Sequence, residues 1–413
     1  MKAYSALFQN RNFLFHWMAG AISYIGDFFN SLALVKILSE DPAHLGFYMS
    51  LIMVSKVLPS ALLSPVAGAL ADRLPRRAIM ITSDLIRAAL VLALVFVEQP
   101  ALILTLVFLS AIASVFYFPA SSAMLPGLVK KEELVTAGSL GVMTQRMAML
   151  LGNGLGAAVL IAVGPHNVFY IDSASFLVSA LLLSFISVPA AARAAASSRS
   201  AWGKFVEDMR ETLAFLKQAS AVRHLMTSLS IASIGDSAIN ILMVTFFTIT
   251  LGIAAEMVGF VWALFGATSV IGALVIGAIG NRVHWRHLFT FGAAYVWFTM
   301  VGALVTSSVI PSTAFLTLLG LGSGATNVAL QAAIGELVPD HVRGRVFGAW
   351  STVQAVLFVS GGLTAGALSD RIGPAPTLLL FSMAFLACAL YAFFAFRKLP
   401  SRQSAPAAPA VGD

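Results

Sequence analysis

The chain has 413 residues, of which 59% are hydrophobic and only 10% are charged. Ordinary soluble domains carry about 25% charged residues, so this composition predicts an integral membrane protein. The single cysteine, Cys388, excludes an intramolecular disulfide, and the seven histidines form neither a metal-binding nor a catalytic motif, so we expect no enzyme, no metal and no cofactor.

Apolar segments bounded by charges, Pro and Gly follow one another along the chain. A helix needs about 20 such residues to cross a bilayer. The expected spans are 12–38, 45–71, 78–97, 101–127, 134–163, 167–188, 224–251, 256–280, 287–307, 312–337, 345–370 and 375–396. We therefore predict an all-α integral membrane fold with 12 transmembrane helices.

Most of the 25 Lys and Arg residues fall in the loops on one side of these spans, while the opposite loops contain essentially only Arg371. Positively charged loops stay in the cytoplasm, so we expect both termini to be cytoplasmic. The net charge of +7 therefore reflects topology, and we expect no nucleic-acid partner.

The longest loop divides the chain into parts. It begins with the Ala- and Ser-rich "PAARAAASSRSA", typical of a flexible linker, and continues as "WGKFVEDMRETLAFLKQ", whose periodicity predicts an amphipathic helix on the membrane surface. The expected divisions are an N-terminal six-helix bundle at 1–188, the cytoplasmic linker at 189–222, a C-terminal six-helix bundle at 223–397 and a disordered tail at 398–413.

An internal repeat runs through the spans at a constant offset. "SYIGDFFNSLALV" at 23–35 contains Asp27, and "ASIGDSAINILMV" at 232–244 repeats the arrangement with Asp236, 209 residues later. "GALADR" falls on "GAIGNR", and Gly164–Pro165 falls on Gly373–Pro374, at the same offset. We infer two halves of similar fold, an arrangement that places a substrate site near the bilayer midplane in transporters.

The loop between the second and third spans, "GALADRLPRR" at 68–77, resembles the G-x-L-x-D-R-x-G-R-R/K signature of the major facilitator superfamily, with Pro75 in place of a glycine. The resemblance implies two pseudo-symmetric six-helix bundles that rock against each other. It also implies an inner gate at this loop, formed by Gly68, Asp72, Arg73, Arg76 and Arg77.

Other segments are similar to the drug and siderophore exporter branch of that superfamily, which includes macrolide efflux proteins and the enterobactin exporter. They are "NRNFLFHW", "DLIRAALVL", "FPASSAMLPGLVKKEEL" and "FYIDSASFLVSALLL". This resemblance implies export of an amphipathic small molecule across a bacterial-type cytoplasmic (inner) membrane by alternating access, in exchange for protons, by a monomer. The fifth span departs from the antiporter signature G-P-x-L-G-G, because it reads "GNGLGA" and lacks the proline.

A stripe of small and polar residues that includes Asp27 and Asn30 follows one face of the first helix. An ionisable residue inside a membrane usually faces the bundle interior and marks a functional site. We expect Asp27 to bind a proton or a cationic substrate group; the alternative is that it hydrogen-bonds a neighbouring helix. Asp236, with Asn240 one turn on, has the same two interpretations.

Two cations lie deep inside apolar spans. Arg146 is expected to recognise an anion or to keep an aspartate ionised, and Lys56 either lines a wet cavity or extends towards the outer surface.

Asp84 and Arg87 are three residues apart on the third helix and can pair there. We assign both to the inner gate, the alternative being a local charge pair. Asp172 is expected to be structural.

Neutral polar residues in the second half, Asn327, Gln331 and Gln354, can orient a ligand or bond to one another.

Rival functions remain open. They are a uniporter or importer of an anionic metabolite centred on Arg146, a lysophospholipid flippase, and a silent membrane scaffold. In the preferred function the partners are an amphipathic small molecule, protons and membrane lipids.

Overall fold

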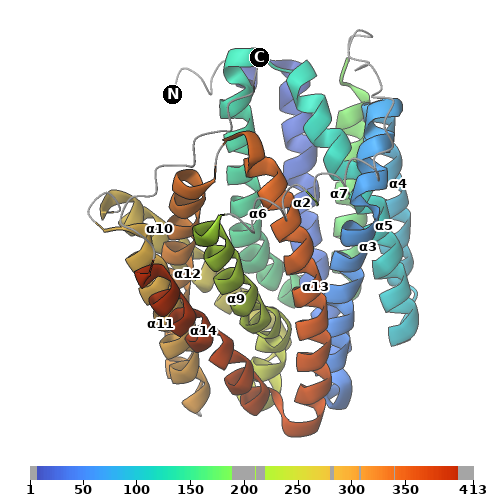
Figure 1. Ribbon diagram of the computed structural model, residues 1–413. Coiled ribbons are helices and arrows are strands. Elements are labelled where there is room, and N and C mark those ends of the chain that lie inside the picture. Colours follow the sequence, from blue (N-terminus) through green and yellow to red (C-terminus); the bar gives the residue numbers. More distant parts are fainter. Residues whose placement is uncertain are drawn as a thin grey trace, which may run out of the picture. The chain divides into compact units, whose positions relative to one another are not determined.

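The computed structural model describes residues 7–187, 210, 219–279, 283–306, 308–338 and 340–398. Within these ranges every regular element is helical. The long helices of the first half are α2 (Arg11–Leu38), α3 (Leu45–Arg73), α4 (Arg76–Leu94), α5 (Pro100–Met124), α6 (Leu134–Val163) and α7 (Pro165–Ser184). Those of the second half are α9 (Ser220–Thr245), α10 (Val258–Ile279), α11 (Trp285–Val305), α12 (Val309–Leu337), α13 (Asp340–Ile372) and α14 (Pro374–Arg397) (Figure 1).

The prediction of an all-α membrane protein with twelve long helices is confirmed. In the described part of the chain, 11 helices are long and apolar enough to cross a membrane. The remaining one, α4, has 19 residues but carries Arg76, Arg77, Asp84 and Arg87, which lower its hydropathy. The surface helix expected within 202–217 lies outside the described residues apart from Arg210, as does the tail beyond Lys398.

The repeat is visible in the positions of the helices. Four helices of the second half, α9, α11, α12 and α14, begin 209 residues after α2, α4, α5 and α7. The turns before α7 and α14 also match, because Gly164 has φ 81° and Gly373 has φ 89°. Each is followed by a proline at the first helical position, where the missing N–H has no helical acceptor to lose. The two halves therefore have the same helical plan.

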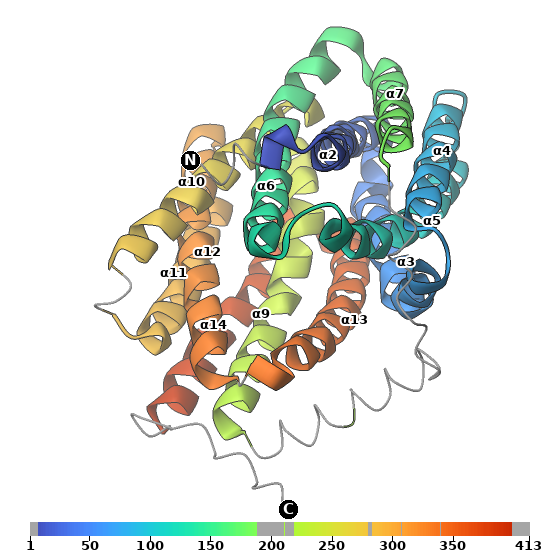
Figure 2. The ribbon, with the colours of Figure 1, turned by 90° about the horizontal axis from the view of Figure 1, so that it is seen from above.

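By compactness the chain divides into two units. Unit 1 is Met1–Phe205 with Val244–Ala263, and unit 2 is Val206–Met243 with Leu264–Asp413. In unit 1, α2 packs against α6 and α7, α4 packs against α7 and α5, and α5 packs against α3. Figure 2 shows this order from above. Glycine permits the closest approaches: a Cβ on Gly152 of α6 would lie 2.7 Å from Phe28 Cβ of α2.

In unit 2, α11 packs against α12 and α14, and α13 also contacts α14. Trp285 and Phe289 of α11 meet Phe396 of α14 edge to face, with ring centroids 5.1 and 5.9 Å apart. Gly361 of α13 approaches Ser237 of α9, a contact 209 residues after that of Gly152 with Phe28. The equivalent helix pairs, α2 with α6 and α9 with α13, therefore both make close contact at a glycine.

Candidate functional site

A cavity of ≈ 480 Å³ lies within unit 1 and is lined by α2, α3, α4, α5 and one residue of α6. Its charged lining residues are Asp27, Lys56 and Arg87, one from each of three helices. Five serines, at 31, 60, 64, 110 and 114, add hydroxyl groups to the wall. Polar groups clustered inside a helical membrane bundle are typical of a cavity that admits water and polar ligands.

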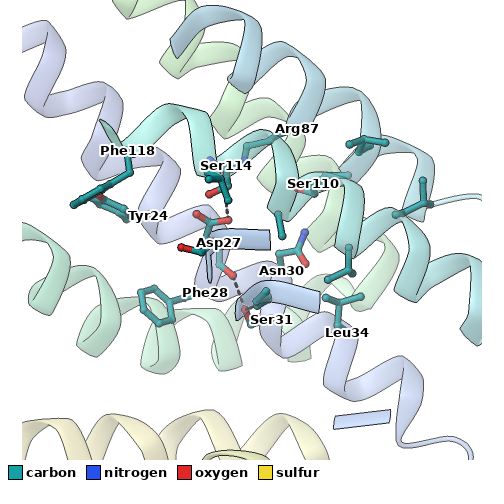
Figure 3. Close-up of a pocket in the computed structure, with 18 of the residues that line it drawn as sticks. Tyr24, Asp27, Phe28, Asn30, Ser31, Leu34, Arg87, Ser110, Ser114 and Phe118 are labelled. Carbon is teal, nitrogen blue, oxygen red and sulfur yellow. Dashed lines mark hydrogen bonds and ion pairs between the residues drawn. The ribbon is translucent and has the colours of Figure 1, made fainter. Parts of the chain in front are cut away.

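Asp27 and Arg87 form an ion pair across this cavity (Figure 3). Arg87 Nη2 donates to Asp27 Oδ1 over 2.6 Å, and the guanidinium carbon lies 3.9 Å from the ring centroid of Phe176 on α7. The Asp27 side chain is 44% exposed, whereas that of Arg87 is 7% exposed. The carboxylate is therefore open to a ligand, while its cationic partner is held behind it.

Asp84 lies behind Arg87 and is fully buried. Ser179 of α7 donates its hydroxyl to Asp84 Oδ2 over 2.6 Å, and Arg87 Nη1 lies 3.9 Å from Asp84 Oδ1. Among the described residues, that second oxygen has no hydrogen-bond partner. The predicted pairing of Asp84 with Arg87 is thus observed at the edge of ion-pair distance.

Asp172 of α7 is the third carboxylate and is also fully buried. Asn30 of α2 donates to its Oδ2 over 2.7 Å, and the Ser175 hydroxyl lies 3.3 Å from its Oδ1. A Cβ at Gly26 would collide with both side chains from α7. Glycine at this position of α2 is what lets Asn30 reach Asp172.

Lys56 enters the same cavity from α3. Its ammonium donates to Ser31 Oγ over 2.7 Å, and that hydroxyl donates to the backbone carbonyl of Asp27 over 2.8 Å. Within the described part of the chain no carboxylate lies within 4.0 Å of Lys56. The ammonium is therefore held at the cavity wall by a neutral group.

A second cavity of ≈ 250 Å³ lies between α2, α5 and α6 of the same unit. Its walls include five aromatic side chains, among them Trp17, whose indole N–H donates to Thr144 Oγ1 over 2.7 Å. Tyr24, Phe118 and Gln145 line both cavities. The larger, charged cavity therefore adjoins the smaller cavity with aromatic side chains in its wall, which is called the aromatic cavity below.

The residues of the expected inner gate lie at the end of α3 and the start of α4. Arg76 Nη1 donates to the Ala123 carbonyl over 2.6 Å, and Arg77 donates to the Ser184 carbonyl. Both carbonyls belong to last turns of helices, α5 and α7, where unpaired carbonyls favour cations. These two arginines therefore tie three helices together at this end of unit 1.

The other gate residues are less engaged. Arg73 is exposed, and no heavy atom lies within 4 Å of a Cβ added to Gly68. The side chain of Asp72 lies outside the described part, as does that of Arg146. The structure places Asp84 and Arg87 with Asp27 and not with this loop, because they lie two to three turns inside α4.

The predicted polar residues of the second half are all exposed within their own unit. They are Asp236, Asn240, Asn327, Gln331 and Gln354. The amide of Asn240 donates to the backbone carbonyl of Asp236 over 2.8 Å. In the described ranges of the chain, neither a hydrogen bond nor an ion pair involves the Asp236 carboxylate.

The repeat does not extend to the partners of the two acids. Val296 and Phe381 stand 209 residues after Arg87 and Asp172. The positions equivalent to Arg87 and Asp172 therefore carry no charge, and no ion pair equivalent to that of Asp27 is found among the described residues of unit 2.

A further ion pair joins the end of α2 to the segment before α10. Lys36 Nζ lies 2.7 Å from Glu256 Oε1, in the 3₁₀ turn η6 (Ala255–Met257). Next to it, a Cβ on Gly259 would lie 2.7 Å from the Asn153 carbonyl of α6. This segment follows the π-helix η5 (Phe246–Thr250) and Gly252, which has φ 68°.

Two residues of the network were not among the sequence-based site residues. Asp172 was assigned a structural role, and Lys56 was left with two interpretations. The signal for both was present, since each is an ionisable residue inside an apolar span. What the sequence lacked was the pairing of α2 with α7 and the position of the cavity.

Comparison with known proteins identifies the family. A model described as Major Facilitator Superfamily matches residues 17–362. The chain belongs to the Major Facilitator Superfamily. It is therefore a membrane transporter and not an enzyme, as the sequence predicts.

Relatives of this Major Facilitator protein cover nearly its whole length. The uncharacterized MFS-type transporter YfiS of Bacillus subtilis (strain 168) is 29% identical over 395 residues, which cover 92% of this chain and 91% of the relative. Macrolide efflux protein A of Streptococcus pyogenes is 24% identical over 371 residues, covering 86% and 89%. The matches support the predicted exporter branch.

A solved structure shows the same fold. It is a bacterial homolog of the human lysosomal transporter Spinster in an inward-facing, unoccupied conformation, with a TM-score of 0.75 at 13% identity. The match covers 94% of this chain and 97% of that one.

Proposed function

We propose that this transporter exports an amphipathic small molecule in exchange for protons. The observation that carries the proposal is the half-exposed Asp27 carboxylate, which faces a ≈ 480 Å³ cavity with Arg87 as its partner. The similarity to a macrolide efflux protein supports the direction of transport. The aromatic cavity next to Asp27 suits the apolar part of such a molecule.

The carboxylates around Arg87 support the proposal of proton exchange. Asp27 and Asp84 both lie within ion-pair distance of the Arg87 guanidinium, and the buried Asp172 lies on α7, which packs against α4. Asp84 and Asp172 are both fully buried, and ionising both at once is unfavourable, so a proton shared within this group is the less costly arrangement. A cationic group bound to Asp27 would weaken the ion pair between Asp27 and Arg87. Arg87 can then turn towards Asp84, and its positive charge favours release of the shared proton.

The same proposal covers topology and assembly. Both termini lie in the cytoplasm of a bacterial cell, the inner gate at 68–77 faces the cytoplasm, and the monomer is the working unit. The positive charge of the loop supports this orientation.

Inverted membrane vesicles containing the protein test the exchange. With the vesicle interior acidified, wild type is expected to accumulate a radiolabelled macrolide, and dissipating the pH gradient should abolish accumulation. Asp27→Asn should reduce gradient-driven uptake about 10-fold or more, since it removes a charge-assisted contact. Glu98→Gln, in the loop after α4, is the matched control and should behave as wild type. Undiminished gradient-driven uptake by Asp27→Asn would refute the role of this residue.

Transport of an anionic metabolite without proton exchange is the second candidate. It is favoured by Lys56, which faces the cavity without a carboxylate partner among the described residues. Transport inhibited by small organic anions and unchanged when the pH gradient is collapsed would support it.

A further inference from the structure

The cavity of unit 1 holds two groups of opposite charge that are open to a ligand. Asp27 projects from α2 and Lys56 from α3, and both line the same ≈ 480 Å³ space. Arg87, the third charged residue of the wall, is only 7% exposed and is already paired with Asp27.

Lys56 is the unusual member of this pair. It lies 11 residues inside α3, roughly 16 Å along the helix axis, which is about half the thickness of the hydrocarbon core. Extension to the membrane surface cannot be its role at this depth, because its ammonium is instead held 2.7 Å from Ser31 Oγ. A hydroxyl neutralises no charge, so the ammonium retains a strong preference for an anion.

Two other cations of unit 1 are paired with acids. Lys36 has Glu256 at 2.7 Å, and Arg87 has Asp27 at 2.6 Å. Among the described residues, Lys56 has no acid at such a distance, although its side chain faces the cavity. The missing counter-charge is what a ligand can supply.

Asp27 retains capacity for a cation. Arg87 occupies its Oδ1, whereas a carboxylate offers about four lone-pair positions on two oxygens. The side chain is 44% exposed, and Figure 3 shows it at the centre of the cavity wall. A primary amine can therefore approach it from the side opposite the guanidinium.

The spacing of the two groups is set by one helix. Lys56 is anchored on Ser31, which lies one helical turn after Asp27 on the same face of α2. One turn is about 5.4 Å, so the site fits an amine and an oxyanion a few bonds apart in one molecule. We propose that the exported molecule is a zwitterion, whose amine binds Asp27 and whose carboxylate or phosphate oxyanion binds Lys56. This inference rests on the proposed export function.

The adjoining aromatic cavity completes the description of the substrate. Tyr24, Phe118 and Gln145 line both spaces, so one molecule can place its charged end in the larger cavity and an apolar group in the smaller. The substrate class is therefore an amphipathic zwitterion.

Binding of charge-matched peptides to the purified full-length protein in nanodiscs tests the inference. The probes are phenylalanyl-phenylalanine, its amide, which lacks the anion, and its N-acetyl derivative, which lacks the cation. Lysophosphatidylethanolamine is a fourth probe, with a phosphate as its oxyanion. Wild type is expected to bind at least one of the two zwitterions about 10-fold more tightly than the amide and the N-acetyl peptide.

Substitutions assign each charge. Lys56→Gln should weaken the preferred zwitterion about 10-fold and leave the amide unchanged, while Asp27→Asn should weaken the zwitterion and leave the N-acetyl peptide unchanged. Lys56→Arg keeps the charge and should retain binding, which separates loss of recognition from loss of folding. If binding of the dipeptide depends on Lys56, the oxyanion of the substrate is a carboxylate. If binding of the lysophospholipid depends on Lys56, the oxyanion is a phosphate.

Tightest binding of the amide, binding of neither zwitterion, or indifference to Lys56→Gln would overturn the inference. Such a result with gradient-driven macrolide uptake intact would leave the export function standing. Loss of gradient dependence with the zwitterion preference intact would instead refute proton exchange alone.

Discussion

Replacing Arg87 by methionine tests the account of the buried charges. Among the described residues, Arg87 is the cation in ion-pair contact with both Asp27 and Asp84, and its side chain is 7% exposed. Losing one partner of a buried ion pair costs about 3–5 kcal/mol, whereas an exposed pair contributes about 0–1 kcal/mol. Asp27 is 44% exposed, so water screens this pair. We expect Arg87→Met to lower the free energy of unfolding by about 2–3 kcal/mol.

The double variant Arg87→Met/Asp27→Asn removes both charges together. It should recover most of that loss, giving a coupling energy of about 1–2 kcal/mol between the two positions. SDS titration of the purified protein, followed by tryptophan fluorescence, measures all three variants against wild type. Arg371→Met, at the exposed end of α13, is the control and should change the free energy of unfolding by less than about 1 kcal/mol.

Additivity would refute this reasoning. If the double variant is destabilised by the sum of the single effects within about 0.5 kcal/mol, the two groups are not coupled. The contact between Asp27 and Arg87 would then contribute no measurable coupling energy. Binding of a ligand at Asp27 could not affect Asp84 through Arg87.

Three further predictions concern the scaffold. Gly164→Ala and Gly373→Ala should each lower stability by about 1–2 kcal/mol in the same titration, because both glycines have positive φ; a loss at only one would contradict their equivalence. Lys36→Glu should impair uptake into vesicles, and adding Glu256→Lys should restore it because the pair is re-formed with reversed charges; failure of the double variant to improve on the single one would argue against the pair. Gly152→Leu should destabilise the protein by about 1–3 kcal/mol through its clash with α2, and an unchanged unfolding curve would disprove that close contact.

Much of the architecture follows from sequence because it depends on local properties. The length of each apolar segment determines whether it can cross the bilayer, and the 209-residue offset is preserved in helix starts and in the turns at Gly164 and Gly373. The importance of Asp27 is also readable, since a carboxylate in an apolar helix needs a partner or water wherever that helix is placed.

The partners of Asp27 are a tertiary property. Arg87 is 60 positions away in the chain, and Asn30 reaches Asp172 across 142 positions. Their position near the inner surface favoured an inner-gate role for Asp84 and Arg87, but in the structure Arg87 lines the cavity and Asp84 is buried beside it, where α4 packs against α7.

The repeat illustrates the same division between local and tertiary information. Sequence shows that Asp27 and Asp236 are equivalent positions, whereas the folded units show that one has a cation beside it and that no such partner is described for the other. Each helix must by itself contain enough apolar residues to cross the bilayer, so the sequence determines the spans. The role of a charged residue inside the membrane depends on the side chains that neighbouring helices place beside it. Only the packing of the helices determines which side chains these are.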